Sequence, residues 1–313
     1  MTSGPVIVVG GPTASGKSGL ALRIAQEFGG EIVNADSMQV YRDLRIVTAR
    51  PPVDDEISVP HHLYGTLGLR ERSSAGSWCE TALAVVRRCH DAGAIPVVVG
   101  GTGLYLRALM TGLNRMPAVP PEIRETLNAR LRKDGPGILH GELAAIDPES
   151  ADRLNPADGQ RIVRALEIFQ HTGKPLSDWQ SAETNSAPTG LRFFTIVTAP
   201  PHEDLYTAIN DRFDRMLEAG AVKEVETLLA AGPDEDFPPL KAVGVPPIRA
   251  FVEGGIDRDR MRELGKRDTR RYAKRQGTWF RHQIIPHFTL ETKLSEKTPG
   301  KIFPEISDFL LTP

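Results

Sequence analysis

A short loop near the start of the chain has the residue types of a phosphate-binding site. Residues 11–18 read Gly-Pro-Thr-Ala-Ser-Gly-Lys-Ser, between an apolar run and an amphipathic segment, which predicts a strand, a loop and a helix in that order. Gly11 and Gly16 let backbone N–H groups turn toward phosphate oxygens, and the helix adds the positive end of its dipole. Lys17 supplies a positive charge, and the hydroxyl of Ser18 is placed to bind Mg²⁺. The residues expected to bind the phosphate compound are Gly11, Pro12, Thr13, Ala14, Ser15, Gly16, Lys17 and Ser18.

A carboxylate, Asp36, follows the second expected strand at residues 31–35. In an open α/β sheet, ligands bind at the carboxyl ends of the strands, so Asp36 should lie near the phosphate loop. A carboxylate in this place can serve catalysis, or it can cap a helix or form a salt bridge. Its position alone leaves these roles open.

The third expected strand, residues 95–99, is followed by Gly-Gly-Thr-Gly and has no acidic residue at its end. Many ATPases with a phosphate loop hold Mg²⁺ with an acid at such a strand end, so a site that activates water for ATP hydrolysis is poorly supported. Gly100 and Gly101 indicate that something bulky, such as a closely approaching ligand, lies over this edge.

The elements that must position these residues follow an α/β pattern with a helical interruption. We predict a phosphate-loop parallel-sheet core at residues 1–114 and 189–313, with helices on both faces of the sheet and a basic helical region near its end. Residues 115–188 contain helix starts and proline breaks but no strand-like run, which predicts an inserted all-helical subdomain. The insertion either serves packing alone or closes as an arm on a large substrate. Residues 48–62, rich in proline and acids, are expected to form an exposed loop.

The composition is that of an ordinary globular protein, with 313 residues and a net charge of -2. This charge excludes a broadly basic surface, so any nucleic acid must be bound by local patches. The best candidate is the amphipathic segment 258–282, in which ten Lys and Arg residues stand against three acids. Such a helix either binds a phosphate backbone or is simply solvated.

The cysteines and histidines do not predict a metal site. Cys79 and Cys89 show neither a disulfide framework nor zinc spacing, and no set of ligand residues accompanies His61 and His62 in the sequence. With no signal segment and no apolar run of membrane-spanning length, we expect a cytoplasmic protein.

Seven motifs, taken in order, resemble one family, the bacterial tRNA dimethylallyltransferases, which are also called tRNA isopentenyltransferases. The motifs are Gly-Pro-Thr-Ala-Ser-Gly-Lys-Ser at residues 11–18, Asn-Ala-Asp-Ser-Met-Gln-Val-Tyr-Arg at 34–42, Val-Pro-His-His-Leu at 59–63, Val-Gly-Gly-Thr-Gly-Leu-Tyr-Leu at 99–106, Gln-Arg-Ile-Val-Arg-Ala-Leu-Glu at 160–167, Thr-Gly-Lys-Pro-Leu-Ser at 172–177 and Tyr-Ala-Lys-Arg-Gln-Gly-Thr-Trp-Phe-Arg at 272–281. The resemblance covers nearly the whole chain. It departs from the usual pattern at residues 46–51, 71–78 and 244–245, which affects fine contacts rather than the activity.

The resemblance implies transfer of a dimethylallyl group from dimethylallyl diphosphate, the donor substrate, to the exocyclic amine of the adenosine next to the anticodon in tRNA. It implies that Asp36 is the general base, and that Lys17, Arg212 and a Mg²⁺ ion on Ser18 stabilise the departing diphosphate. The insertion would clamp the tRNA anticodon stem-loop. The residues implied for tRNA binding are Asp36, Ser37, Met38, Gln39, Thr102, Arg124, Gln160, Arg161, Ile162, Val163 and Arg164. We expect a monomer that makes no contact with a membrane.

Two other functions share parts of this pattern. A small-molecule or nucleotide kinase would use the same loop, Lys17, Mg²⁺ and a carboxylate at a strand end, but it would not need the insertion or the basic tail. A non-catalytic RNA-binding module that uses the loop as a nucleotide switch would leave Asp36 without a role.

Overall fold

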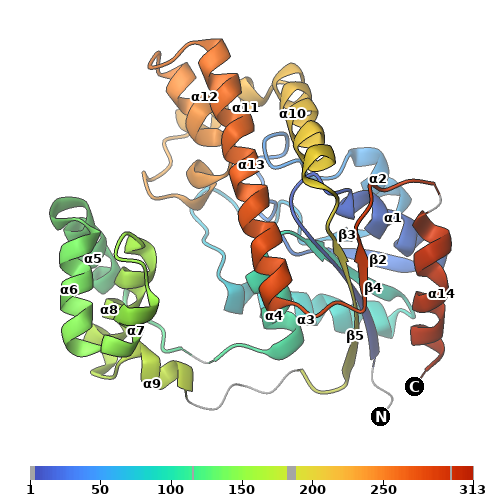
Figure 1. Cartoon of the computed structure of the whole chain (residues 1–313), viewed down its shortest axis with the longest axis horizontal. Coiled ribbons are helices and arrows are strands. Elements are labelled where there is room, and N and C mark those ends of the chain that lie inside the picture. Colours follow the sequence, from blue (N-terminus) through green and yellow to red (C-terminus); the bar gives the residue numbers. More distant parts are fainter. Residues whose placement is uncertain (1–3, 115, 182–187, 297, 313) are drawn as a thin grey trace. The chain divides into compact units, whose positions relative to one another are not determined.

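The computed structural model describes residues 4–114, 116–181, 188–296 and 298–312 (Figure 1). The chain forms two compact units, one made of Met1–Thr111 together with Pro188–Pro313 and the other of Gly112–Ala187. We call the first the sheet unit, because it holds all the strands found in the described residues. The second, the helical unit, contains helices and connecting segments over its described part.

The sheet unit is organised around one parallel sheet with the strand order β3-β2-β4-β1-β5-β6. The strands in the described residues are β1 (Gly4–Gly10), β2 (Gly30–Asn34), β3 (His61–His62), β4 (Ile95–Gly100), β5 (Leu191–Thr198) and β6 (Phe288–Leu290). The central strand β1 pairs with β4 and β5, so that Ile7 lies opposite both Val97 and Phe194. Because the strands run parallel, their carboxyl ends meet at one edge of the sheet.

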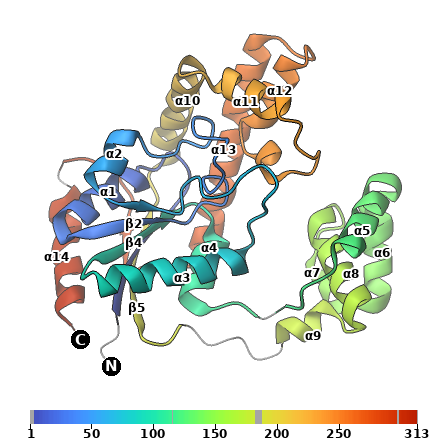
Figure 2. The same ribbon diagram turned by 180° about the vertical axis from the view of Figure 1, so that it is seen from behind.

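Helices cover both faces of this sheet (Figure 2). On one face, α1 and α14 pack against Ile7 and Val97, and on the other, α3, α4 and α13 pack against Val6, Val8 and Val98. The strands are apolar on both sides and therefore need both layers. The arrangement confirms the predicted fold class. The helices of the sheet unit are α1 (Lys17–Phe28), α2 (Val53–Ser58), α3 (Ala75–Asp91), α4 (Gly103–Thr111), α10 (His202–Glu218), α11 (Ala221–Ala230), the short 3₁₀ helix η1 (Pro238–Lys241), α12 (Val245–Val252), α13 (Arg258–Gln283) and α14 (Thr298–Leu311).

Single residues fix where these helices begin and end. Gly29 adopts a left-handed conformation, with φ of 61°, and ends α1. The Ser74 hydroxyl accepts the N–H of Ser77 at 3.0 Å and opens α3. In the same way, the carboxylate of Asp257 accepts the N–H of Arg260 at 2.7 Å and opens the long helix α13.

The prediction of an exposed loop over residues 48–62 is wrong in part. This segment contains α2 and ends in β3. Asp54, Asp55 and Glu56 lie in the first turn of α2, where acidic side chains interact favourably with the helix dipole. The same acids that indicated a loop therefore stabilise a short helix.

The helical unit has a core of its own. Its helices are α5 (Pro121–Asp134), α6 (Pro136–Ile146), α7 (Pro148–Arg153), α8 (Gly159–Thr172) and α9 (Leu176–Ser181). Leu127, Leu139, Leu143 and Ile162 are all 0% exposed within it. Asp147 links two of its helices, because its carboxylate accepts the N–H of Ser150 and that of Ser177, each at 3.0 Å. In neither unit do the described residues include a helix with the length and apolar character needed to cross a membrane.

Candidate active site

The loop at residues 11–18 joins β1 to α1 at the carboxyl edge of the sheet. Gly11 and Gly16 have φ values of 146° and 85°, which only glycine adopts readily. A Cβ atom at Gly11 would also overlap Thr198 at the end of β5. The hydroxyls of Ser15 and Thr198 are hydrogen-bonded at 2.5 Å, so the loop is tied to the neighbouring strand.

Lys17 lies in the first turn of α1 and is folded over the loop. Its Nζ donates to the carbonyl oxygen of Pro12 at 3.2 Å, and no described carboxylate lies within ion-pair distance of it. Burial lowers the pKa of Lys17 to about 8, attraction by Asp36 raises it, and repulsion by Arg212 lowers it. The ammonium form still predominates at neutral pH, so the loop holds a positive charge that an anion could pair with.

Arg212 brings a second positive charge to the loop from α10. Its Nη2 donates to the hydroxyl of Thr13 at 2.5 Å. Burial lowers the pKa of Arg212 to about 10, with Asp36 acting in the opposite direction. The guanidinium therefore stays charged near neutral pH and faces the same loop as Lys17.

Asp36 follows β2 at the same edge of the sheet. Its N–H donates to Oδ1 of Asn34 at 2.9 Å, and its own Oδ1 accepts the N–H of Met38 at 2.9 Å. Oδ2 makes no hydrogen bond with any described residue. Asp36 interacts electrostatically with both Lys17 and Arg212. The structure thus brings together the three residues that the sequence pointed to, and one carboxylate oxygen is open to accept a proton.

The residues after Asp36 are held by the β4–α4 turn and by the following loop. The hydroxyl of Thr102 accepts the N–H of Ser37 at 2.9 Å and donates to the Ser37 hydroxyl at 3.2 Å. The Nε2 of Gln39 donates to the carbonyls of Thr48 and Ala49, at 2.8 and 3.0 Å. The residues that surround Asp36 on this side of the site are therefore Thr102, Ser37, Met38 and Gln39.

The remaining residues expected to bind tRNA lie on the helical unit. Glu167 is 2% exposed and accepts from Arg124 at 2.9 and 3.2 Å and from Arg164 at 3.2 Å. Arg161 is paired with Asp158 at 3.5 Å. Gln160 and Arg161 are exposed at the start of α8. These residues form a polar, basic surface.

Ile162 and Val163, which belong to the stretch 160–164 that is expected to bind tRNA, have buried side chains. They are 0% and 4% exposed and belong to the core of the helical unit. The helical repeat points these two side chains inward while Gln160, Arg161 and Arg164 lie on the other side. These side chains hold α8 in place, and a contact of the two residues with tRNA, which stays a prediction, would use their backbone atoms.

Gln276, which the sequence did not indicate, lies over the glycines that follow β4. A Cβ at Gly101 would overlap the Gln276 amide, and a Cβ at Gly103 would overlap the ring of Trp279. The bulky group over Gly101 is therefore α13 of the same chain, and a Cβ at Gly100 would overlap the backbone of Ala35, so neither glycine requires a ligand. The one sequence signal for Gln276 was its place inside the seventh motif.

His62 also has neighbours that its sequence context did not show. Ligand atoms of Glu31, His62 and Cys89 lie within 4.8 Å of one another, although the three residues are far apart in the chain. The Nε2 of His62 is 2.6 Å from Glu31, and the guanidinium of Arg88 is 3.3 Å from Nδ1. Burial, followed by Glu31, raises the pKa of the Cys89 thiol to about 12. The group is thus a hydrogen-bonded cluster in which the thiol stays protonated.

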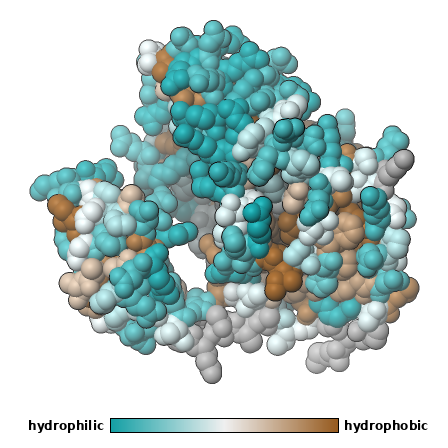
Figure 3. Space-filling model, viewed as in Figure 1, coloured by the Kyte–Doolittle hydropathy of each residue, from teal (hydrophilic) through white to brown (hydrophobic). Residues whose placement is uncertain are grey.

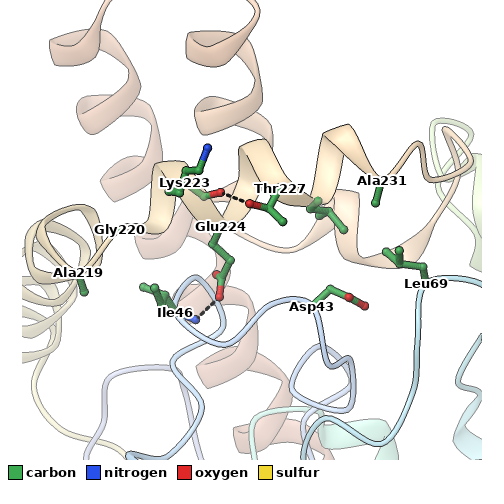
Figure 4. A pocket seen from close by; sticks show the side chains of 10 residues that line it. Asp43, Ile46, Leu69, Ala219, Gly220, Lys223, Glu224, Thr227 and Ala231 are labelled. Carbon is green, nitrogen blue, oxygen red and sulfur yellow. Dashed lines mark hydrogen bonds between the residues drawn. The ribbon is translucent and has the colours of Figure 1, made fainter.

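A pocket of about 490 Å³ lies between α11 and the loop that follows the Asp36 segment (Figure 4). Glu224 points from α11 to that loop and accepts three backbone N–H groups, those of Arg45, Ile46 and Val47, at 2.6 to 2.8 Å. Its carboxylate is therefore engaged in holding the loop. The pocket is lined by Asp43, Ile46, Leu69, Ala219, Gly220, Lys223, Glu224, Thr227, Leu228 and Ala231 and includes no residue of the phosphate loop.

Comparisons with known proteins agree with the motifs. The family model of IPP transferase matches residues 39–283, and that of isopentenyl transferase matches residues 4–70. A tRNA dimethylallyltransferase of Rhodospirillum centenum is 51% identical over 280 residues, covering 90% of this chain and 89% of that protein. One from a Bradyrhizobium strain is 48% identical over 288 residues, covering 92% and 93%.

Solved structures give the same result. The tRNA isopentenylpyrophosphate transferase of Bacillus halodurans superposes with a TM-score of 0.69 at 31% identity, covering 99% of this chain and 96% of that one. A eukaryotic dimethylallyltransferase acting on tRNA reaches a TM-score of 0.82 at 27% identity, covering 98% and 80%. These matches confirm the predictions of the family, of a transferase and of prenyl transfer to tRNA, and they favour neither the kinase nor the nucleotide switch. With one family model matching most of its length, the chain belongs to the IPP transferase family.

Proposed function

We propose that the phosphate loop binds the diphosphate of dimethylallyl diphosphate, and that Asp36 accepts the proton from the exocyclic amine of the adenosine next to the anticodon. The observation that carries this proposal is the joint placement of Asp36, Lys17 and Arg212 at the carboxyl edge of the sheet. Two cations face the loop where a diphosphate would lie. A carboxylate with an open oxygen stands within electrostatic reach of both.

The transfer makes one carbon–nitrogen bond and breaks one carbon–oxygen bond, and a proton then passes from the nitrogen to Asp36. The amine nitrogen bonds to the allylic carbon of the donor, while the bond from that carbon to the diphosphate oxygen breaks and its electron pair leaves with the diphosphate. Lys17, Arg212 and the loop N–H groups stabilise the negative charge that develops there. The alkylated amine is acidic, and Asp36 takes its proton.

The residues present fit a Mg²⁺ ion at Ser18. Its hydroxyl is exposed at the first turn of α1 and makes no hydrogen bond with the residues that the structure describes. Hydroxyl and phosphate oxygens are ligands that Mg²⁺ prefers. When bound, the ion would supply further positive charge for the departing diphosphate.

We propose two basic surfaces as contacts for the RNA backbone. On the helical unit, Arg124, Gln160, Arg161 and Arg164 form the first, and this unit acts as the clamp on the anticodon stem-loop. On the sheet unit, the view in Figure 3 shows mainly hydrophilic residues over α10 and α13. Within α13, the exposed basic residues at the end toward the site are Arg271, Lys274, Arg275 and Arg281. Phosphate contacts of this kind supply affinity without reading sequence.

A transfer assay tests the proposed function. Purified protein, Mg²⁺ and labelled dimethylallyl diphosphate are incubated with unmodified tRNA that carries adenosine next to the anticodon. We expect the label in one nucleoside, with the new group on the exocyclic amine. A matched tRNA with guanosine at that position should stay unlabelled. Label on both RNAs, or on neither, would contradict the proposal.

Lys17 predicts a pH dependence of donor use. As pH rises past about 8, the free enzyme loses the Lys17 ammonium, so kcat/KM for dimethylallyl diphosphate should fall. The bound diphosphate attracts the ammonium and raises the pKa of Lys17, so the fall in kcat should come at higher pH. Steady-state kinetics over this range measure both. If kcat and kcat/KM fell at the same pH on the alkaline side of their pH profiles, a charge contact between Lys17 and the donor would be contradicted.

The clamp predicts a change in salt dependence. Replacing both Arg161 and Arg164 with alanine should weaken tRNA binding. The slope of the logarithm of the binding constant against the logarithm of the salt concentration should become shallower by about 1 for each phosphate that the protein no longer neutralises. Glu167 keeps Arg124 as a partner, so α8 should remain folded. The control removes two exposed charges from α5 by replacing Arg132 and Lys133. Equal slopes in the two double variants would count against the clamp.

We also propose that the enzyme acts as a monomer, because Asp36, Lys17 and Arg212 all come from one chain. Sedimentation with and without tRNA tests this. The cytoplasm, which holds the tRNA pool, is the compartment proposed for the reaction.

A further inference from the structure

The long basic helix α13 does more than present charge, because it packs directly on the edge of the sheet that carries the site. It fits there because three positions facing it are glycine, and a Cβ atom at any of them would overlap an α13 side chain. The facing pairs are Gly10 with Phe280, Gly101 with Gln276, and Gly103 with Trp279. The helix therefore lies close to the turns that follow β1 and β4.

Gln276 is the polar member of this set, and both ends of its amide are bonded. Its Oε1 accepts the N–H of Thr13 at 2.9 Å, and its Nε2 donates to the carbonyl oxygen of Gly101 at 2.8 Å. The side chain is 6% exposed. Turning the amide over would place the NH₂ group against an N–H and the oxygen against a carbonyl, so only one orientation satisfies both partners.

These two bonds join the two sides of the site. On the donor side, Thr13 belongs to the phosphate loop and its hydroxyl is bonded to Arg212. On the acceptor side, Gly101 precedes Thr102, whose hydroxyl accepts the N–H of Ser37, the residue after Asp36. A continuous chain of hydrogen bonds and short backbone links therefore runs from Arg212 to the Asp36 segment, and Gln276 is its centre.

We propose that Gln276 is a positioning residue for the transfer, which sets the separation between the diphosphate loop and the acceptor side that carries Asp36. This inference rests on the proposed function. Because the Thr13 N–H points to Gln276, the diphosphate is bound by the other N–H groups of the loop, Lys17 and Arg212. Loss of Gln276 leaves those groups in place and disturbs their alignment with Asp36. Misplacement of reacting groups by about 1 Å lowers rates by about 10²-fold.

The first test is the Gln276→Met variant, which keeps the approximate shape but loses both hydrogen bonds. Its kcat should fall by about 10²-fold, while KM for dimethylallyl diphosphate stays close to the wild-type value. Exchange of the Thr13 amide hydrogen, measured without substrates, should become faster. The control is Thr269→Val on the same helix, where a side chain of similar burial, 7% exposed, bonds only within the helix, to the Gly265 carbonyl at 2.7 Å. This control should keep the wild-type kcat and KM.

The second test is the Gln276→Glu variant, which has nearly the same volume. Its ionised carboxylate accepts from Thr13 but has no proton for the Gly101 carbonyl. A protonated carboxyl group can both accept from Thr13 and donate to Gly101, as the amide does. The ratio of kcat for this variant to wild-type kcat should therefore rise as pH is lowered, and the corresponding ratio for Gln276→Met should not. A role in packing alone predicts no such rise.

The outcomes separate this inference from the proposed function. An active wild-type enzyme whose Gln276→Met variant keeps the wild-type kcat would overturn the positioning role. So would a Gln276→Glu ratio that does not change with pH. A wild-type enzyme that transfers nothing to tRNA would overturn the proposed function instead, and faster exchange at Thr13 would still support the bond between Gln276 and the loop.

Discussion

Replacement of Asp36 with asparagine should lower the rate of transfer by about 10²–10⁴-fold, the usual contribution of a general base. The amide has almost the same shape, and its oxygen can still accept the N–H of Met38 as Oδ1 does at 2.9 Å. It cannot take a proton from the alkylated amine. The affinity for tRNA, measured by filter binding, should stay nearly unchanged. Single-turnover transfer with both substrates bound measures the rate.

The result for Asp36 must be separated from a general effect of removing a carboxylate. The control is Asp91→Asn, at the exposed end of α3, which should transfer at the wild-type rate. If Asp36→Asn weakened tRNA binding and left the single-turnover rate intact, Asp36 would recognise the adenine and would not serve as the general base.

Replacement of Lys17 with methionine should lower kcat by about 10²–10³-fold, comparable to the loss of one group that stabilises developing negative charge. KM for dimethylallyl diphosphate should rise as well, because the ammonium also attracts the ground-state diphosphate. Arg212 and the loop N–H groups remain, so some activity persists. Steady-state kinetics with varied donor concentration measure both effects.

Stability should not explain the loss at Lys17. Burial lowers the pKa of Lys17 to about 8, which means that the fold disfavours its charged form relative to the unfolded chain. An apolar side chain of similar length removes that penalty, so the melting temperature should be equal or higher. The control is Lys301→Met on the exposed side of α14. A Lys17→Met enzyme with unchanged kcat and KM would exclude the loop as the diphosphate site.

The parts of the fold that the sequence predicted are those with a strong local pattern. The runs in β1, β4 and β5 are apolar because both faces of these strands are buried, and the phosphate loop has fixed residue types. The three-residue strand β6 was missed, because its pairing of Phe288 with Ile196 depends on a strand far away in the chain. The helix α2 was missed because six residues with three acids resemble a loop.

Among the residues of the site, too, those with a local sequence pattern were predicted and those held by distant contacts were not. Lys17, Ser18 and Asp36 lie in or directly after local patterns of loop and strand end, so the sequence alone indicated them. Gln276 contributes through bonds to backbone atoms 263 and 175 residues away, which no local pattern reveals. At Ile162 and Val163 a contiguous motif was carried over whole, whereas a helix buries only one side of such a stretch, so only backbone atoms of these two residues are left for a contact with tRNA.

In the proposed reaction the phosphate loop holds a leaving group and does not supply energy. The most direct measurement is the amount of diphosphate released for each adenosine that is prenylated, with Mg²⁺, donor and tRNA present and every nucleoside triphosphate left out. We expect complete transfer, with one diphosphate released for each prenylated adenosine. Transfer that requires ATP, or diphosphate release that runs without transfer, would contradict the account.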